Sequence, residues 1–152
     1  MTGPVSIQRV SVTSLYWVGP ATVAAAVLAV SAVQWIAVDR LRPLPRFSER
    51  VLTSTEPAVV TAVLVSAAVL VFVVCVHLAA DPLHAYRQIA FGALLISFVP
   101  NGAAALLLRP AADWPSMIAL MVMHVTAWAV TVTMLTRLPV VRDRDDGSAP
   151  PE

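Results

Sequence analysis

Few side chains of this 152-residue chain could do chemistry, and those few lie within or beside long apolar runs. His124 stands in the middle of one run, and an imidazole can take up or release a proton near neutral pH. Gln34 and Asn101 stand in two other runs, where a carboxamide can hydrogen-bond a ligand or a developing oxyanion. Asp39 and Glu56 adjoin the runs. The set predicts a polar-lined binding site or an acid–base site, with His124 moving protons and Glu56 or Asp39 assisting.

The residues around His124 indicate an apolar ligand. Met121 and Trp128 follow its helical spacing, and so do Met117 and Thr131. Flexible Met and flat Trp beside an imidazole suit a hydrophobic molecule with one polar end. Packing explains the same stripe equally well, with His124 hydrogen-bonded to a neighbouring helix. Both interpretations stay open at this stage.

A metal site or a covalent cofactor is not predicted. His77, Asp81 and His84 are spaced by four and three residues, but Asp81-Pro82 is typical of a helix start, so we expect an interfacial cap there. The single cysteine, Cys75, cannot form a disulfide within the chain. No cofactor motif is found.

Four runs without Asp, Glu, Lys or Arg must position these side chains. Each is about 20 residues or longer, the length of a helix that crosses a bilayer. The chain is 59% hydrophobic and 12% charged, and its net charge of +1 does not favour a nucleic-acid partner. The pattern predicts an all-α fold: an integral membrane four-helix antiparallel bundle forming one domain, residues 1–138, followed by a disordered polar tail, residues 139–152. The expected helices span about residues 17–38, 58–80, 82–108 and 115–136.

Small residues and one proline predict how the helices meet. Ala25 and Ala29 in the first helix, and Ala62 and Ser66 in the second, form ridges that allow close approach in lipid. Pro100 removes one backbone hydrogen bond inside the third helix and predicts a kink. We therefore expect the first two helices to pack along these ridges.

Depth along the helices brings the polar side chains together. At a rise of about 1.5 Å per residue, His124 lies about 12 Å, Asn101 about 10 Å and Gln34 about 6 Å below the surface opposite the termini. Glu56 heads the second helix on the same side, with Asp39 in the adjoining link. The sequence thus predicts a crevice in one leaflet, with carboxylates at its mouth.

Three segments resemble known sequences. These are PATVAAAVLAVSAVQWIA, FGALLISFVPNGAAALLL with its Ser-x-x-Pro, and IALMVMHVTAWAVTVTMLTRL with a mid-span His. Together they resemble a family of small, uncharacterised four-span integral membrane proteins of actinobacteria. The resemblance covers roughly Trp17–Leu138, and its most specific elements are Ser97, Pro100, His124 and Arg137. It implies the fold and a membrane location, and it brings no activity.

Three functions compete at this stage. The first is binding or carrying a lipophilic small molecule in the crevice, through Gln34, Asn101, His124, Trp128 and Met121. The second is a membrane-embedded acid–base enzyme, an isomerase or cyclase of a terpenoid- or polyketide-like substrate. The third is an accessory subunit that docks on a membrane partner or on a second copy. We expect a multi-pass protein of a bacterial cell membrane. Five arginines fall on each side of the predicted bundle, so their distribution does not favour either membrane orientation. The charged tail favours cytoplasmic termini.

Overall fold

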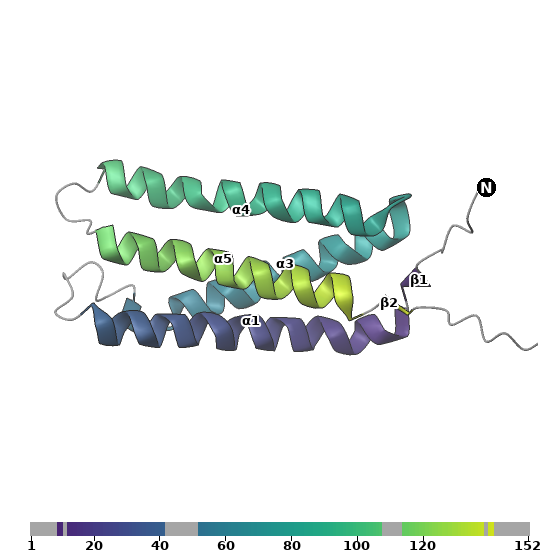
Figure 1. Ribbon diagram of the computed structural model, residues 1–152, viewed down its shortest axis with the longest axis horizontal. Coiled ribbons are helices and arrows are strands. Elements are labelled where there is room, and N and C mark those ends of the chain that lie inside the picture. Colours follow the sequence, from purple (N-terminus) through teal and green to yellow (C-terminus); the bar gives the residue numbers. More distant parts are fainter. Residues whose placement is uncertain (1–8, 11, 42–51, 108–113, 139, 142–152) are drawn as a thin grey trace, which may run out of the picture.

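The described part of the chain is a bundle of four long helices (Figure 1). The computed structural model describes residues 9–10, 12–41, 52–107, 114–138 and 140–141. The helices are α1 (Val12–Arg40), α3 (Glu56–Leu78), α4 (Pro82–Leu107) and α5 (Trp114–Arg137). Consecutive helices run in opposite directions, so the predicted all-helical antiparallel bundle is confirmed.

A short pair of strands joins the two ends of the bundle's chain. β1 (Arg9–Val10) pairs antiparallel with β2 (Val140–Val141), in the register Arg9 with Val141 and Val10 with Val140. Both segments therefore lie at one end of the bundle (Figure 1). Apart from Val140–Val141, the predicted tail after Leu138 lies outside the described residues.

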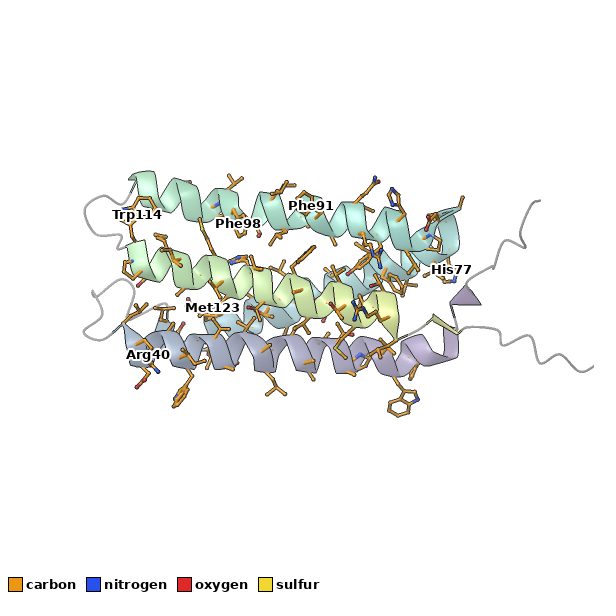
Figure 2. All side chains as sticks on the ribbon, viewed as in Figure 1. Arg40, His77, Phe91, Phe98, Trp114 and Met123 are labelled. Atoms are coloured by element: carbon orange, nitrogen blue, oxygen red, sulfur yellow. The ribbon has the colours of Figure 1, made fainter. Side chains whose placement is uncertain are left out.

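Three of the described helices are long and apolar enough to cross a membrane: Tyr16–Arg40 within α1, Glu56–Leu78 and Trp114–Arg137. Their outward faces are apolar, and α3 in particular buries few of its side chains inside the bundle. Trp17, Trp35 and Trp114 are exposed near helix ends, where aromatic side chains sit at a membrane interface. Figure 2 shows Trp114 at the end of the bundle opposite the termini. These features fit a membrane protein.

Helix α4 begins with a polar segment. Its first two turns carry His84, Arg87 and Gln88, all exposed. Pro100 lies inside α4, as expected, and the helix continues through it to Leu107.

The first two long helices pack together, and the most buried residues of α1 are not those of the predicted ridge. The buried stripe of α1 contains Thr22, Ala26 and Val30, whereas Ala25 and Ala29 are only half-buried. On α3, Ser66 is exposed, and its hydroxyl donates to Ala62 O at 2.7 Å. A serine or threonine hydroxyl that is satisfied within its own helix needs no partner across an interface. Small size alone therefore did not decide which face was buried.

Gly19 marks a close approach of α1 and α3. A Cβ at this position would lie 3.2 Å from Val69 Cγ1, whereas a Cβ at Gly92 of α4 would meet nothing within 4 Å. We expect Gly19→Leu to lower the free energy of unfolding by about 1–2 kcal/mol, because the larger side chain forces α1 and α3 apart. Gly92→Leu is the matched control and should not destabilise. Unfolding by dodecyl sulfate in mixed micelles measures both, and equal stability of the two variants would contradict the close approach.

Two clusters of buried side chains hold the bundle, one towards each end. Phe72, Cys75, Tyr86 and Leu135 form the first, which joins α3, α4 and α5 near the termini. Val30, Leu52 and Met123 form the second near the opposite end. Figure 2 shows Met123 between α5 and α1. The space between these clusters is the region that matters for function.

Candidate functional site

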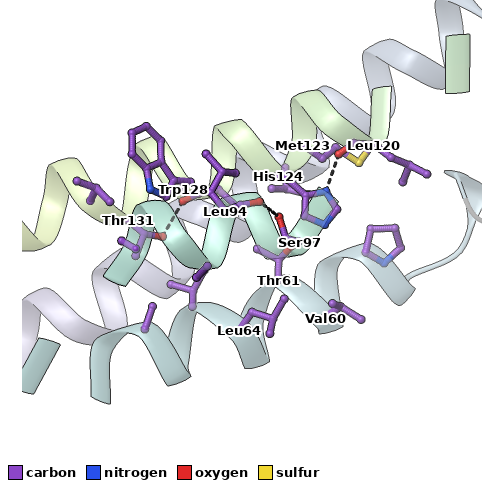
Figure 3. A pocket seen from close by; sticks show the side chains of 18 of the residues that line it. Val60, Thr61, Leu64, Leu94, Ser97, Leu120, Met123, His124, Trp128 and Thr131 are labelled. Atoms are coloured by element: carbon purple, nitrogen blue, oxygen red, sulfur yellow. Dashed lines mark hydrogen bonds between the residues drawn. The ribbon is translucent and has the colours of Figure 1, made fainter. Parts of the chain in front are cut away.

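A cavity of about 340 Å³ lies between α3, α4 and α5, with Val30 of α1 at one wall (Figure 3). Its lining on α3 runs from Glu56 to Ala68, which is about 18 Å at the helical rise of about 1.5 Å per residue. On α5 it runs from Leu120 to Val132. Most of the lining is aliphatic. The size and the apolar walls are those of sites that bind small molecules.

Polar side chains from three helices line one part of this cavity. Thr61 of α3, Ser97 of α4 and His124 of α5 all belong to the lining, and Figure 3 shows Ser97 beside His124 with Thr61 below them. His124 Nδ1 lies 2.7 Å from Leu120 O. A carbonyl can only accept, so Nδ1 donates this hydrogen bond, and Nε2 is an acceptor whenever the ring is neutral. Ser97 Oγ donates to Leu94 O at 2.7 Å and also keeps acceptor capacity.

An aromatic contact holds the imidazole of His124 in place. The Phe98 ring lies 6.3 Å from the His124 ring, centroid to centroid, with an interplanar angle of 62°. This edge-to-face geometry is the favourable one for aromatic pairs. Together with the Nδ1 hydrogen bond, it orients the ring without occupying Nε2.

Two buried donors in the lining have no hydrogen-bond partner among the described residues. They are Trp128 Nε1 and Tyr86 Oη. Tyr86 is 1% exposed, and its ring packs edge-to-face on Phe72 at 5.0 Å and 77°. Buried polar groups in proteins are nearly always hydrogen-bonded, so unpaired ones are typical of functional sites. These two donors distinguish the cavity from a simple packing gap.

The cavity opens towards the outside of the bundle between α3 and α4. Val60 and Leu64 belong to the lining, yet they are 54% and 56% exposed. Ala93 of α4 is also exposed and belongs to the lining. The exposed Glu56 lies at the end of the lining where α3 begins. In a membrane, such an opening faces lipid rather than water.

The predicted site residues divide between the cavity and other places. His124, Trp128 and Glu56 line the cavity. Gln34 does not: its Nε2 donates to Leu52 O at 2.7 Å and to Ser54 O at 2.9 Å. Both amide hydrogens are thereby engaged, since an amide nitrogen has two. Gln34 anchors the segment that precedes α3 and is not a wall of the site.

The remaining predicted residues also lie elsewhere. Asp39 is 67% exposed in its side chain, and its Oδ2 lies 3.8 Å from Arg40 Nε at the end of α1. Met121 is half-buried and is not part of the lining, where Met123 of the same helix takes its place. Asn101 lies in α4, but its side chain is outside the described part. Of the two residues at helical spacing from His124 that we predicted to bind a ligand, Trp128 lines the cavity and Met121 does not.

The predicted cap at the start of α4 is present. Asp81 Oδ1 accepts the His84 backbone N–H at 3.1 Å, the geometry of an N-cap. His77 Nδ1 lies 2.8 Å from Val73 O, within its own helix. These contacts agree with the interfacial interpretation of the three residues. Among the described residues, no cluster of three His, Cys, Asp or Glu could hold a metal ion.

Sequence reasoning missed Thr61 and Tyr86 as site residues. Thr61 lies one turn beyond Pro57 in an apolar helix, and a lone threonine there gives no signal, because its hydroxyl can bond its own helix. Tyr86 lies near the start of α4, where a tyrosine is typical of a membrane interface rather than of a binding site. A signal was available for Ser97, since it precedes Pro100 by three residues in the predicted kink.

Comparisons of this chain with protein-family models, with curated proteins and with solved structures find no match, so the resemblance to the actinobacterial family stays a prediction.

Proposed function

We propose that this protein binds a lipophilic small molecule in the cavity between α3, α4 and α5. The observation that carries the proposal is the cavity itself: about 340 Å³, mostly aliphatic, with His124 and two unpaired donors in its walls. Sites for small apolar ligands combine apolar walls with a few placed polar groups. We place the protein in a bacterial cell membrane with cytoplasmic termini as part of this proposal.

Binding has better support than acid–base catalysis. The catalytic hypothesis requires Gln34 and Asn101 to hold an oxyanion while Glu56 or Asp39 assists His124. Gln34 donates both amide hydrogens to backbone carbonyls, and Asp39 lies at the surface beside Arg40. Among the described side chains that this hypothesis uses, only Glu56 and His124 line the cavity. A binder needs only the walls and the hydrogen-bonding groups already in place.

Filling the cavity tests the proposal. Ala68 belongs to the lining, whereas its neighbour Ala67 is exposed and outside the lining. We expect Ala68→Phe to weaken binding of a hydrophobic probe at least tenfold, because the ring takes the ligand's space. Ala67→Phe adds the same ring to the outer face and should leave binding unchanged.

The measurement is quenching of Trp128 fluorescence by bromododecane in lipid nanodiscs. Replacing Trp17, Trp35 and Trp114 by Phe leaves Trp128 as the only tryptophan of the chain, which has four. Bromine quenches only on close approach, so quenching reports a probe inside the cavity. Identical quenching curves for the Ala68 and Ala67 variants would overturn the proposal.

A further inference from the structure

The unpaired hydrogen-bond donors in the cavity wall define which hydrogen-bonding group the ligand must carry. An indole N–H can donate a hydrogen bond but cannot accept one. Trp128 Nε1 is buried in the cavity wall and has no partner among the described residues. Leaving such a buried donor unpaired is energetically unfavourable. A ligand that supplies an acceptor atom at this point removes that cost, and a pure hydrocarbon does not.

The charged side chains of the lining limit the chemical class of the ligand further. Among the lining residues that the structure describes, Glu56, at one end of the cavity, has the only charged side chain. A carboxylate or phosphate ligand would therefore enter an apolar cavity in which no described lining residue supplies a cation, which is strongly unfavourable. A primary ammonium group could not satisfy Trp128, because it has no acceptor. An uncharged oxygen acceptor meets both conditions.

The opening of the cavity indicates where such a ligand comes from. The exposed lining residues Val60, Leu64 and Ala93 lie on α3 and α4, and their sequence neighbours Val63, Phe91 and Leu95 are exposed apolar side chains. A molecule dissolved in the bilayer can reach this opening without crossing water. The route therefore selects compounds that partition into lipid, which agrees with an uncharged ligand.

We infer that the cavity binds an uncharged lipophile from the bilayer through a carbonyl or ether oxygen that accepts the Trp128 Nε1 hydrogen bond. The inference rests on the proposed function and adds the ligand class. Tyr86 supplies a second unpaired donor to the same cavity. The acceptors His124 Nε2 and Ser97 Oγ remain for any donor that the ligand carries elsewhere along its length.

Matched probes test the ligand class. Methyl decyl ketone and dodecane have the same number of carbons and differ by one carbonyl oxygen. In nanodiscs with the full chain, we expect the ketone to bind about tenfold more tightly than dodecane, the effect of one hydrogen bond to a buried donor. Dodecylammonium should bind no more tightly than dodecane.

Trp128→Phe removes the N–H and keeps an aromatic ring. In this variant the ketone and dodecane should bind with nearly equal affinity, while the affinity for dodecane stays within about twofold of the original. Trp35→Phe, on the exposed face of α1, is the matched control and should keep the tenfold preference. Retained dodecane binding shows that the cavity of the Trp128 variant is intact.

A spectroscopic measurement on the unsubstituted protein makes the result independent of any folding defect. The Trp128 indole N–H resonance should move downfield when the ketone is added and should not do so with dodecane. Equal affinities for the two probes, or a preference that survives Trp128→Phe, would overturn the inferred ligand class. By contrast, equal dodecane binding by Ala68→Phe and Ala67→Phe would overturn the proposed function itself.

Discussion

Replacing Phe72 by alanine is expected to lower the free energy of unfolding by about 3 kcal/mol, the largest single effect we predict. Phe72 is fully buried, lies in the cluster with Cys75 and Leu135, and packs edge-to-face on Tyr86. The estimate lies at the lower end of the range for aqueous cores. In lipid, the transfer of the side chain from water contributes little, and lost packing contributes most.

Phe91→Ala is the matched control for this prediction. Phe91 lies on α4 and is 53% exposed, so its removal should change stability by less than about 0.5 kcal/mol. Titration with dodecyl sulfate in mixed micelles compares the two variants. Similar losses for both would contradict the buried cluster. Phe72→Ala should also release Tyr86, which lines the cavity, and thus weaken ligand binding in the quenching assay.

The second large effect is expected for Gln34→Leu, which should cost about 2 kcal/mol of stability and leave ligand binding unchanged. Leucine is close to glutamine in size, but it cannot donate to the carbonyls of Leu52 and Ser54. Both carbonyls then lose a partner, and Leu52, a member of the second buried cluster, loses its anchor.

Gln88→Leu controls for the loss of a carboxamide in a helix. Gln88 is exposed on α4, and its Nε2 lies 3.0 Å from His84 Nε2, so its replacement should be nearly neutral. The decisive comparison is between stability and binding. If Gln34→Leu weakens probe binding while stability is unchanged, Gln34 is a ligand-binding residue. That result would agree with the prediction from its depth below the membrane surface.

The sequence predicted some residues of the cavity and not others, and the difference has a physical explanation. Depth along each helix can be counted from its ends, so the level of His124 followed from sequence. Which way a side chain faces depends on helix rotation, and a helix that is apolar all round, such as α3, leaves that rotation unspecified. For this reason the sequence did not identify Thr61, and it placed Gln34 of α1 in the crevice by depth alone, whereas its side chain bonds the backbone before α3.

The positions of the helices were easier to predict from the sequence than the residues of the site. Long charge-free runs, together with the Asp81-Pro82 start of the third helix, placed all four helices within a few residues of α1, α3, α4 and α5, apart from the earlier start of α1. These signals are local: a missing N–H is tolerated in the first helical turn, and a charge is costly in lipid. The extension of α1 back to Val12 carries no such signal.

By itself, the sequence determined a four-helix bundle suited to lipid and a histidine at mid-depth, because length, hydropathy and proline position act within single segments. Only the tertiary structure decided that α3, α4 and α5 enclose a cavity, that Trp128 and Tyr86 line it with unpaired donors, and that Gln34 serves the backbone instead. The physical reason is that helix association in lipid depends on close packing and hydrogen bonds between segments, and a one-dimensional pattern records neither.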